Sequence, residues 1–352
     1  MAPVQAPADA GDLGASIDDL RASFARAAEH TDVLELTIRL ADAPIRLCFA
    51  GAGLRAELGR AFAHLAAEPG AAPELTIYAW DSSDSSAAQP ALPKLEPGSP
   101  RGTTVYSSDP ERQLVSRPAL GQLSGYDRGT ATGWFWCRDL RELPFWERAA
   151  PFRQILHWWL PQRNVLFVHA AAVGYASGGL LLVGAGGSGK SSCALASLGS
   201  ELLYAGDDYV AVQLGPEPRV VSLYSSGKLT PGHATLFAHL PPASFVGDGG
   251  VEEKSVFYVG ERFPDRMCEG FPLRAIVAPR VQGDAPRVGP LPAVEALAAL
   301  APSTLLQLVP ARQEALSAMA GLLTSIPAFR LDVGGPVEGL PATLQQLLQE
   351  IG

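Results

Sequence analysis

The chain has 352 residues, which is enough for one large domain or two ordinary ones. Its hydrophobic fraction of 47% and charged fraction of 18% predict a sizeable buried core and argue against a mostly disordered chain. The formal net charge is −9 and no basic run stands out, so we expect no nucleic-acid partner.

The four cysteines stand far apart and form no Cys-x-x-Cys pair, so neither a zinc site nor a disulfide framework is predicted. Buried, reduced thiols in a cytoplasmic protein are the simplest interpretation. The first residues lack the basic and apolar regions of a signal peptide, and no apolar stretch is unbroken enough to cross a membrane. We therefore expect a cytoplasmic protein with no membrane partner and a flexible N-terminal tail over residues 1–29.

The next part of the chain, residues 30–148, predicts a small α+β domain. Leu34, Leu36 and Ile38 alternate with polar or smaller residues, and a turn followed by a second alternating segment predicts a hairpin. A helix is predicted over residues 54–67, and further strands over 75–80, 104–106, 113–115 and 133–137, with an exposed loop over 81–101. We interpret the six tryptophans, which all precede residue 160, as packing residues rather than a binding surface.

The remaining part, residues 149–352, predicts an α/β domain. A helix begins near Pro151 and ends at Pro161, and one of its faces is apolar. A strand over 164–174 leads through a hairpin turn into a strand over 180–183. Further strands are predicted over 201–204, 209–214, 219–224, 273–278 and 329–333, and helices over 190–198, 231–239, 291–300, 303–308, 311–325 and 336–349.

A phosphate-binding loop lies between the strand that ends at Val183 and the helix that follows. The run consists of Gly184, Ala185, Gly186, Gly187, Ser188, Gly189, Lys190 and Ser191, with Ser192 next, and it matches G-x-x-x-x-G-K-[ST] in full. Its backbone N–H groups would cradle phosphate oxygens, Lys190 would reach the β- and γ-phosphates, and Ser191 would bind Mg²⁺. We expect ATP or a related nucleotide with Mg²⁺. No Asn-Lys-x-Asp segment of a GTPase is present.

Two carboxylates and a histidine flank this loop in sequence. Asp207 and Asp208 follow a strand that we expect to return beside the loop, where one could hold Mg²⁺ and the other accept a proton from a hydroxyl. Both can serve only if the chain turns there, which Gly206 allows; a turn or helix-cap pair is the alternative. His169 lies on the strand expected to pair with the one entering the loop, where spacing alone favours a hydrogen-bonded core histidine.

Together, His169-Ala170, the loop and the Asp207-Asp208 pair resemble the HPr kinase/phosphorylase family. The resemblance extends to the HPr-kinase-related proteins of bacterial peptide-biosynthesis gene clusters. It implies a P-loop kinase domain of the HPr kinase C-terminal type over 149–352, preceded by the smaller α+β domain. It also implies that Asp208 is the base, that Asp207 assists at the metal together with Ser191 or at the proton, and that His169 orients the carboxylates.

The chain departs from the family at the Glu-x-Arg-Gly signature, where it has Ser225-Ser226-Gly227-Lys228-Leu229. Lys228 is therefore a candidate to contact phosphate where the family has its signature arginine. No carboxylate in this chain replaces the signature glutamate. Lys254 is a candidate contact above the acceptor. It follows Glu252 and Glu253 in a segment after the glycine-rich run 247–250. A solvated surface turn is the alternative for this segment.

These observations predict a Mg²⁺-ATP-dependent kinase that phosphorylates a hydroxyl, with serine of a peptide or small protein as the leading acceptor. The domain over 30–148 would recognise the substrate, and the resemblance allows a homo-oligomer. Two alternatives remain open, a kinase for a small metabolite and a non-catalytic nucleotide-binding adaptor.

Overall fold

The computed structural model describes residues 5–8, 13–96, 99–100, 102–240, 242–246, 254–311 and 313–352. The chain forms two compact units, the first made of Met1–Arg60 and Leu65–Gln162, the second of Ala61–His64 and Arg163–Gly352. The division near Gln162 falls later in the chain than the expected boundary after residue 148, because the helix that follows Pro151 packs within the first unit. Its Ile155 lies against the sheet at Gly133.

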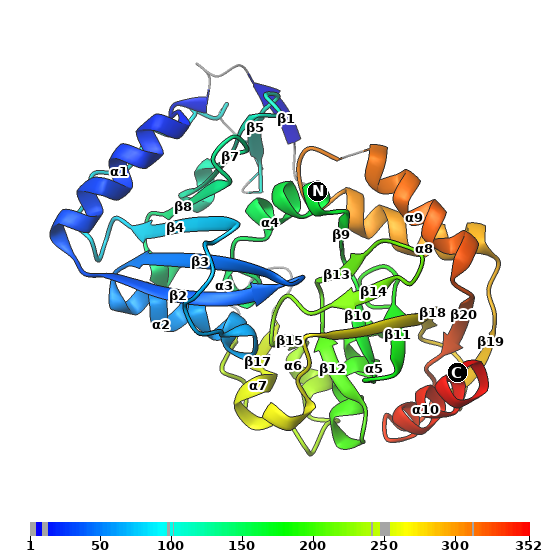
Figure 1. The fold of residues 1–352 in the computed structure, drawn as a ribbon. Helices are drawn as coiled ribbons and strands as arrows, with labels where there is room; N and C mark the ends of the chain where they lie inside the picture. The colour runs from blue at the N-terminus through cyan, green and yellow to red at the C-terminus, as the bar shows by residue number, and fades with distance from the viewer. Residues whose placement is uncertain are drawn as a thin grey trace. The chain divides into compact units, whose positions relative to one another are not determined.

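The first unit contains an eight-stranded sheet among its described residues (Figure 1). Its strands are β1 (Gln5–Ala8), β2 (Val33–Leu40), β3 (Ala43–Ala50), β4 (Leu75–Asp81), β5 (Thr104–Ser107), β6 (Arg112–Arg117), β7 (Gln122–Asp127) and β8 (Thr132–Cys137). They lie in the order β1-β5-β6-β7-β8-β4-β3-β2. The β2–β3 hairpin is antiparallel, as expected, whereas β4 runs parallel to both of its neighbours, β3 and β8. The sequence did not predict β7.

The expected flexible tail over residues 1–29 is wrong for its second half, which forms helix α1 (Ile17–His30). Ser16 begins the helix with a capping box, since its hydroxyl accepts from the Asp19 N–H at 3.2 Å and the Asp19 carboxylate accepts from the Ser16 N–H at 2.8 Å. Ile17, Leu20 and Ala27 are buried on one face. The Ser16 and Asp19 spacing is a local signal of this helix start in the sequence. Residues 1–4 and 9–12 of the predicted tail lie outside the described residues.

Helices cover both faces of this sheet. A Cβ added at Gly125 would meet Ile17 and Leu20 of α1, and one at Gly133 would meet Ile155 of α4 (Arg153–Trp159). Gly125 pairs with the residue after Gly133, so these two glycines face opposite sides of the sheet. The unit also contains α2 (Ala52–Gly59), α3 (Phe145–Ala149) and short 3₁₀ helices at Pro118–Leu120 and Leu140–Glu142, while the 3₁₀ helices at Arg60–Leu65 and Leu160–Arg163 lie where the chain passes between the two units. The tryptophans at 80, 134, 136, 158 and 159 are buried, as expected of packing residues.

The second unit has a mixed sheet, which confirms the α/β class. Its strands are β9 (Val165–Val168), β10 (Ala171–Tyr175), β11 (Gly178–Leu182), β12 (Leu203–Gly206), β13 (Val210–Gln213), β14 (Arg219–Val221), β18 (Gly270–Arg280), β19 (Arg287–Pro290) and β20 (Ala328–Asp332). The order is β12-β10-β11-β18-β14-β13-β9, with β20 paired to β18 and β19 to β20. A separate three-stranded sheet, not predicted from sequence, has the order β15 (Ser226–Leu229), β17 (Ser255–Tyr258), β16 (Phe245–Val246).

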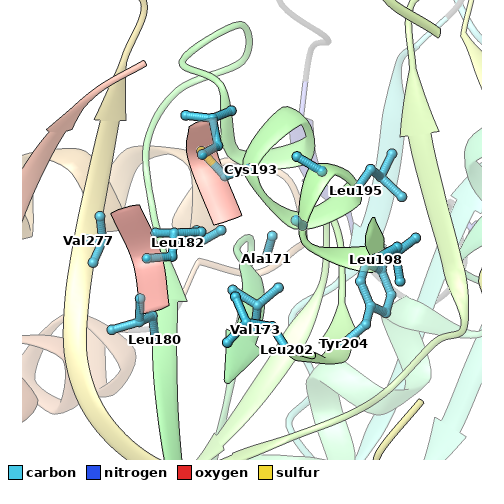
Figure 2. Close-up of a cluster of buried hydrophobic side chains, with 14 of the residues drawn as sticks. Ala171, Val173, Leu180, Leu182, Cys193, Leu195, Leu198, Leu202, Tyr204 and Val277 are labelled. Atoms are coloured by element: carbon cyan, nitrogen blue, oxygen red, sulfur yellow. The ribbon is translucent and has the colours of Figure 1, made fainter. Parts of the chain in front are cut away.

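The helices of this unit are α5 (Lys190–Ala196), α6 (Pro231–Ala234), α7 (Val259–Arg262), α8 (Ala293–Leu305), α9 (Gln313–Ser325) and α10 (Gly339–Ile351), with 3₁₀ helices at Ser197–Gly199 and Pro264–Arg266. The helices predicted over 291–300 and 303–308 are one helix, α8, and the one predicted over 231–239 ends at Ala234. Figure 2 shows α5 and the turn after it packing Cys193, Leu195 and Leu198 against Leu182 of β11 and Tyr204 of β12. This buried layer fixes the helix that follows the phosphate loop.

All four cysteines are free, and three of them, Cys48, Cys137 and Cys193, are buried. Burial raises the pKa of the Cys193 thiol to about 12. Cys193 therefore acts as a small apolar residue in the core beneath the loop, as the sequence predicts.

We predict that Ser16→Ala loosens α1 without unfolding the second unit. Loss of the cap costs about 1 kcal/mol of helix stability, so amide hydrogens of α1 should exchange about fivefold faster, as measured by hydrogen–deuterium exchange with mass spectrometry. Ser317→Ala, on the exposed surface of α9, is the matched control. Unchanged exchange over α1 in Ser16→Ala would show that packing alone holds the helix.

Candidate functional site

The glycine-rich loop connects β11 to α5, as the sequence predicts. Gly184 has φ 146°, and a Cβ at this position would lie 2.6 Å from the Ser188 hydroxyl oxygen, so a side chain here would disrupt the turn. The Lys190 ammonium donates to the Gly184 carbonyl at 2.6 Å and to the Ala185 carbonyl at 3.2 Å. The lysine therefore folds back over the loop, and its side chain reaches the loop's own backbone.

The loop has the features of an anion cradle. Ala185, Gly186 and Gly187 are exposed, and a Cβ added at either glycine would meet no atom within 4 Å. The Ser188 hydroxyl oxygen is buried and has no hydrogen-bond partner among the described residues. Such an unsatisfied group costs free energy unless a ligand or water supplies a partner. The open backbone and this hydroxyl fit a bound phosphate chain. Ser192, the last residue of the predicted set, is half-buried on α5.

The histidine and the acidic pair meet because two neighbouring strands break at the same level. The predicted strand over 164–174 is interrupted at His169 and Ala170, which separates β9 from β10. The antiparallel partner is interrupted between β12 and β13 by Asp207, Asp208 and Tyr209. Val168 pairs with Val210 below the break, and Ala172 pairs with Gly206 above it. Counting inward from either pair places His169 opposite Tyr209, next to Asp208. The expectation that His169 lies within a continuous strand is therefore wrong.

The acidic pair is also placed differently from the expectation that its strand lies beside the loop strand. Strand β10 pairs with β11 on one side and with β12 on the other, so it separates β12 from the strand that enters the loop. The side chain of Asp207 bridges this distance, because its Oδ1 accepts a hydrogen bond from the Ser191 hydroxyl at 2.9 Å.

The chain makes a tight turn at the acidic pair. The Tyr209 N–H donates to the Asp207 carbonyl at 2.8 Å, and Asp208 between them has φ 69°. A left-handed conformation is strained for a residue with a side chain, and such residues often mark functional positions. Gly206, at φ 154°, precedes the turn. The chain therefore turns at the acidic pair, where strand alternation alone would not have presented both side chains to one site.

Asp208 lies between two basic groups. Its Oδ1 accepts from His169 Nε2 at 3.0 Å, and its Oδ2 pairs with the Lys228 ammonium. Its side chain is 19% exposed, whereas those of His169 and Lys228 are 8% and 5% exposed. Asp207 is buried more deeply, at 1% exposure, and its Oδ2 accepts from the Lys228 backbone N–H at 3.0 Å. Of the two carboxylates, Asp208 is thus the one that a second reactant could reach.

The His169 ring is held from several directions. Its backbone N–H donates to the Thr304 hydroxyl at 3.2 Å, at the C-terminal end of α8, and its ring contacts Tyr209 edge-on with centroids 5.3 Å apart. A carboxylate only accepts, so Nε2 carries the proton that faces Asp208. Nδ1 is buried and has no hydrogen-bond partner among the described residues. Sequence reasoning missed Thr304, which sits among apolar residues of α8 without any local signal.

Burial and neighbouring charges shift the pKa values of the two carboxyl groups in opposite directions. Burial, together with the neighbouring Asp208 charge, raises the pKa of Asp207 above its usual value. Burial also acts to raise the pKa of Asp208, but the Lys228 charge and the His169 hydrogen bond outweigh it and hold that pKa well below the usual range. Asp208 is therefore a carboxylate at neutral pH, fixed by both of its basic neighbours.

Three lysines share this region. Burial lowers the pKa of Lys190, the two aspartates oppose that shift, and the charges of Lys254 and Lys228 add to it. The charges of Lys254 and Lys228 therefore both act on Lys190. Glu252 and Glu253, from the same predicted segment, lie outside the described residues.

Ser191 and Asp207 are the residues that could hold a magnesium ion. The hydroxyl and carboxylate oxygens are hard ligands, and Mg²⁺ is usually bound by one or two protein oxygens, with water and phosphate completing its shell. Their 2.9 Å contact at the base of the loop fits this chemistry. Across the described ranges, no group of three or more His, Cys, Asp or Glu residues is placed to hold a metal.

Comparisons with known proteins give little beyond this geometry. No protein family and no curated protein matches the chain. Among solved structures, the chain is similar to the HPr(Ser) kinase/phosphatase from Coxiella burnetii, with a TM-score of 0.27 and 12% sequence identity, over 52% of this chain and 94% of that chain. Similarity at this level is too distant to show a shared activity. In the part of the chain that is described, no helix is long and apolar enough to span a membrane.

We predict that Asp207→Asn stabilises the protein while weakening its response to Mg²⁺. A raised pKa means that the folded state holds the Asp207 proton more tightly than the unfolded state does. The stability of the fold therefore falls as the pH rises from the pKa of Asp207 in the unfolded chain through its pKa in the folded protein. Asparagine removes that cost and can keep hydrogen bonds to Ser191 and to the Lys228 N–H. The melting temperature at neutral pH should rise by about 2–4 °C, for about 1 kcal/mol, and by less in mild acid.

The same variant should lose most of the additional thermal stabilisation that Mg²⁺ gives together with a non-hydrolysable ATP analogue. Asp265→Asn, an exposed carboxylate in the same unit, is the control and should retain that stabilisation. An Asp207→Asn protein that melts lower than wild type and still responds fully to Mg²⁺ would contradict both parts.

Proposed function

We propose that the second unit is a Mg²⁺-ATP-dependent kinase of the HPr kinase C-terminal type that phosphorylates a hydroxyl group. Serine in a peptide or small protein is the acceptor that the family resemblance favours. One observation carries the proposal: the acidic pair is joined to the phosphate loop. Asp207 contacts the loop serine, Ser191, at 2.9 Å, and the adjacent Asp208 has the more exposed of the two carboxylates.

The loop and its lysines would bind the nucleotide. Backbone N–H groups of the glycine-rich run and the start of α5 would surround the phosphates, and the ammonium of Lys190 would exchange its carbonyl partners for phosphate oxygens. Lys254 would add its positive charge to that of Lys190. Bound Mg²⁺ would neutralise charge on the phosphates, and Ser191 with Asp207 would hold it. These groups act by positioning and electrostatics, which carry most of the catalysis in phosphoryl transfer.

Asp208 would receive the proton of the acceptor hydroxyl. Its carboxylate is ionised, partly exposed and fixed by His169 and Lys228, so it can orient an incoming hydroxyl without moving. Its low pKa makes it a weak base toward a neutral alcohol. That suits a loose transition state, in which the proton leaves late, after the oxygen has begun to bond to phosphorus. The hydroxyl oxygen then carries the phosphoryl group, the proton passes to Asp208, and the former β–γ bridging oxygen leaves with ADP.

The assay that tests this function follows radioactive γ-phosphate from Mg²⁺-ATP into three acceptor pools. The pools are degenerate peptides that contain serine, the same peptides with alanine at that position, and a panel of hydroxylated metabolites. We expect label in the serine peptides with the wild type and none with Lys190→Met. Lys94→Met, an exposed lysine of the first unit, is the matched control.

Each other pattern of label overturns part of the proposal. Label in the metabolites alone would replace the peptide acceptor with a small molecule. Tight Mg²⁺-ATP binding without label in any pool would identify a nucleotide-binding adaptor and end the kinase proposal. Retained transfer in Lys190→Met would remove the loop from the mechanism.

We predict that Asp208→Asn lowers the transfer rate by about 10²-fold or more, with the affinity for Mg²⁺-ATP unchanged within about threefold. The amide cannot take up a proton under these conditions, whereas the loop that binds the nucleotide is intact. Initial rates in the label assay and calorimetric titration with a non-hydrolysable ATP analogue measure the two quantities.

The same substitution leaves the Lys228 ammonium buried without its carboxylate, so thermal unfolding of Asp208→Asn must be checked beside the rates. Rates should be compared well below the melting temperature of the variant. A folded Asp208→Asn protein that transfers label at the wild-type rate would exclude Asp208 as the proton acceptor.

A further inference from the structure

Lys228 contacts both members of the acidic pair. Its backbone N–H donates to Asp207 Oδ2 at 3.0 Å, and its ammonium forms an ion pair with Asp208 Oδ2. The family resemblance implies a phosphate contact for this residue, in place of a family arginine. The structure instead directs its ammonium to a carboxylate.

This ion pair lies in a largely dehydrated environment. The Lys228 side chain is 5% exposed, so its charge requires a fixed partner, and the Asp208 carboxylate is one. The other Asp208 oxygen is occupied by His169. The Asp208 side chain is thus held at both oxygens, and removal of Lys228 would free the one that faces β15.

Gly227 brings the backbone of β15 close enough for these contacts. A Cβ at Gly227 would lie 2.7 Å from a methyl carbon of Leu195 in α5 and 3.1 Å from the Tyr204 hydroxyl. That hydroxyl donates to the Ser226 carbonyl at 2.8 Å and so ties β15 to β12, the strand that leads into the acidic pair. Contacts to both α5 and β12 therefore fix the strand that carries Lys228.

The use of lysine in this chain gives independent support. The sequence contains four lysines, at 94, 190, 228 and 254, and arginine fills the other basic positions. Three of the four lie around the phosphate loop and the acidic pair. Lysine presents a compact point charge, whereas arginine presents a planar fork, so the choice of lysine at these positions indicates a specific need for an ammonium group.

We propose that Lys228 is a positioning residue for phosphoryl transfer, which holds the Asp208 carboxylate toward the acceptor hydroxyl and does not bind the phosphates itself. This role rests on the proposed kinase function. It predicts that Lys228 matters only while Asp208 is present, and that nucleotide affinity does not depend on Lys228.

A double-mutant cycle tests the role, with wild type, Lys228→Met, Asp208→Asn and the double variant compared in the serine-peptide label assay. We expect Lys228→Met to lower the rate at saturating Mg²⁺-ATP by at least about tenfold in the wild-type background and by less than about twofold in the Asp208→Asn background. Lys228→Arg should restore part of the rate because it keeps the charge. Calorimetric titration with Mg²⁺ and a non-hydrolysable ATP analogue should give a dissociation constant for Lys228→Met within about threefold of wild type.

Folding of the variants is monitored by thermal unfolding. The double variant, which removes both charges of the pair, should melt higher than Asp208→Asn, and it keeps the test valid if one single variant fails to fold. In that case the nucleotide affinity of the double variant decides, since a phosphate-binding lysine would raise its dissociation constant.

The failures are distinguishable. Additive rate losses in the cycle, or a dissociation constant raised about tenfold or more by loss of Lys228, would overturn the positioning role and restore a phosphate contact. A wild-type protein that binds Mg²⁺-ATP but transfers no label to any acceptor would overturn the kinase proposal, and this role with it.

Discussion

The site depends on the two contacts that fix the Asp208 carboxylate, the hydrogen bond from His169 and the ion pair with Lys228. A left-handed backbone at φ 69° presents the side chain, and His169 and Lys228 each take one of its oxygens. His169 follows β9, Asp208 follows β12 and Lys228 lies on β15, so these two contacts connect three separate segments of the second unit. Because a strained backbone and a dehydrated ion pair both cost free energy, their coincidence at one residue indicates a requirement beyond folding.

The adjacent carboxylates are made unequal by what surrounds them. Asp207 is buried and its pKa is raised, so its ionisation lowers the stability of the fold once the pH rises above the pKa that Asp207 has in the unfolded chain. The lowered pKa of Asp208 has the opposite effect: it contributes stability above the unfolded value, and that stability is lost as pH falls toward the folded one. A metal ion at Asp207 and Ser191 would relieve the first cost. The pair therefore divides into Asp207, which holds its proton more tightly than a free carboxyl does, and Asp208, which stays ionised.

The fold produces this arrangement by interrupting two paired antiparallel strands at the same level. Strands β9 and β10 read in the sequence as one segment, and their antiparallel partners β12 and β13 flank the acidic pair. Continuous strands would have placed alternate side chains on opposite faces, whereas the shared break lets His169 and Asp208 converge. Strand β10 lies between β12 and the loop strand β11, so Asp207 reaches Ser191 by its side chain alone.

The sequence by itself determined the glycine-rich loop, the α/β class and the candidacy of Asp207 and Asp208, because these depend on local residue types at fixed spacing. His169 became a candidate only through the family resemblance, since its spacing alone favoured a core histidine. The capping signal of α1 at Ser16 is equally local. Only the tertiary structure decided that Lys228 pairs with Asp208, and that its backbone serves Asp207. Hydrogen bonds and ion pairs between segments far apart in the chain depend on strand order and on where strands break. Packing decides both, and no short run of residues encodes them.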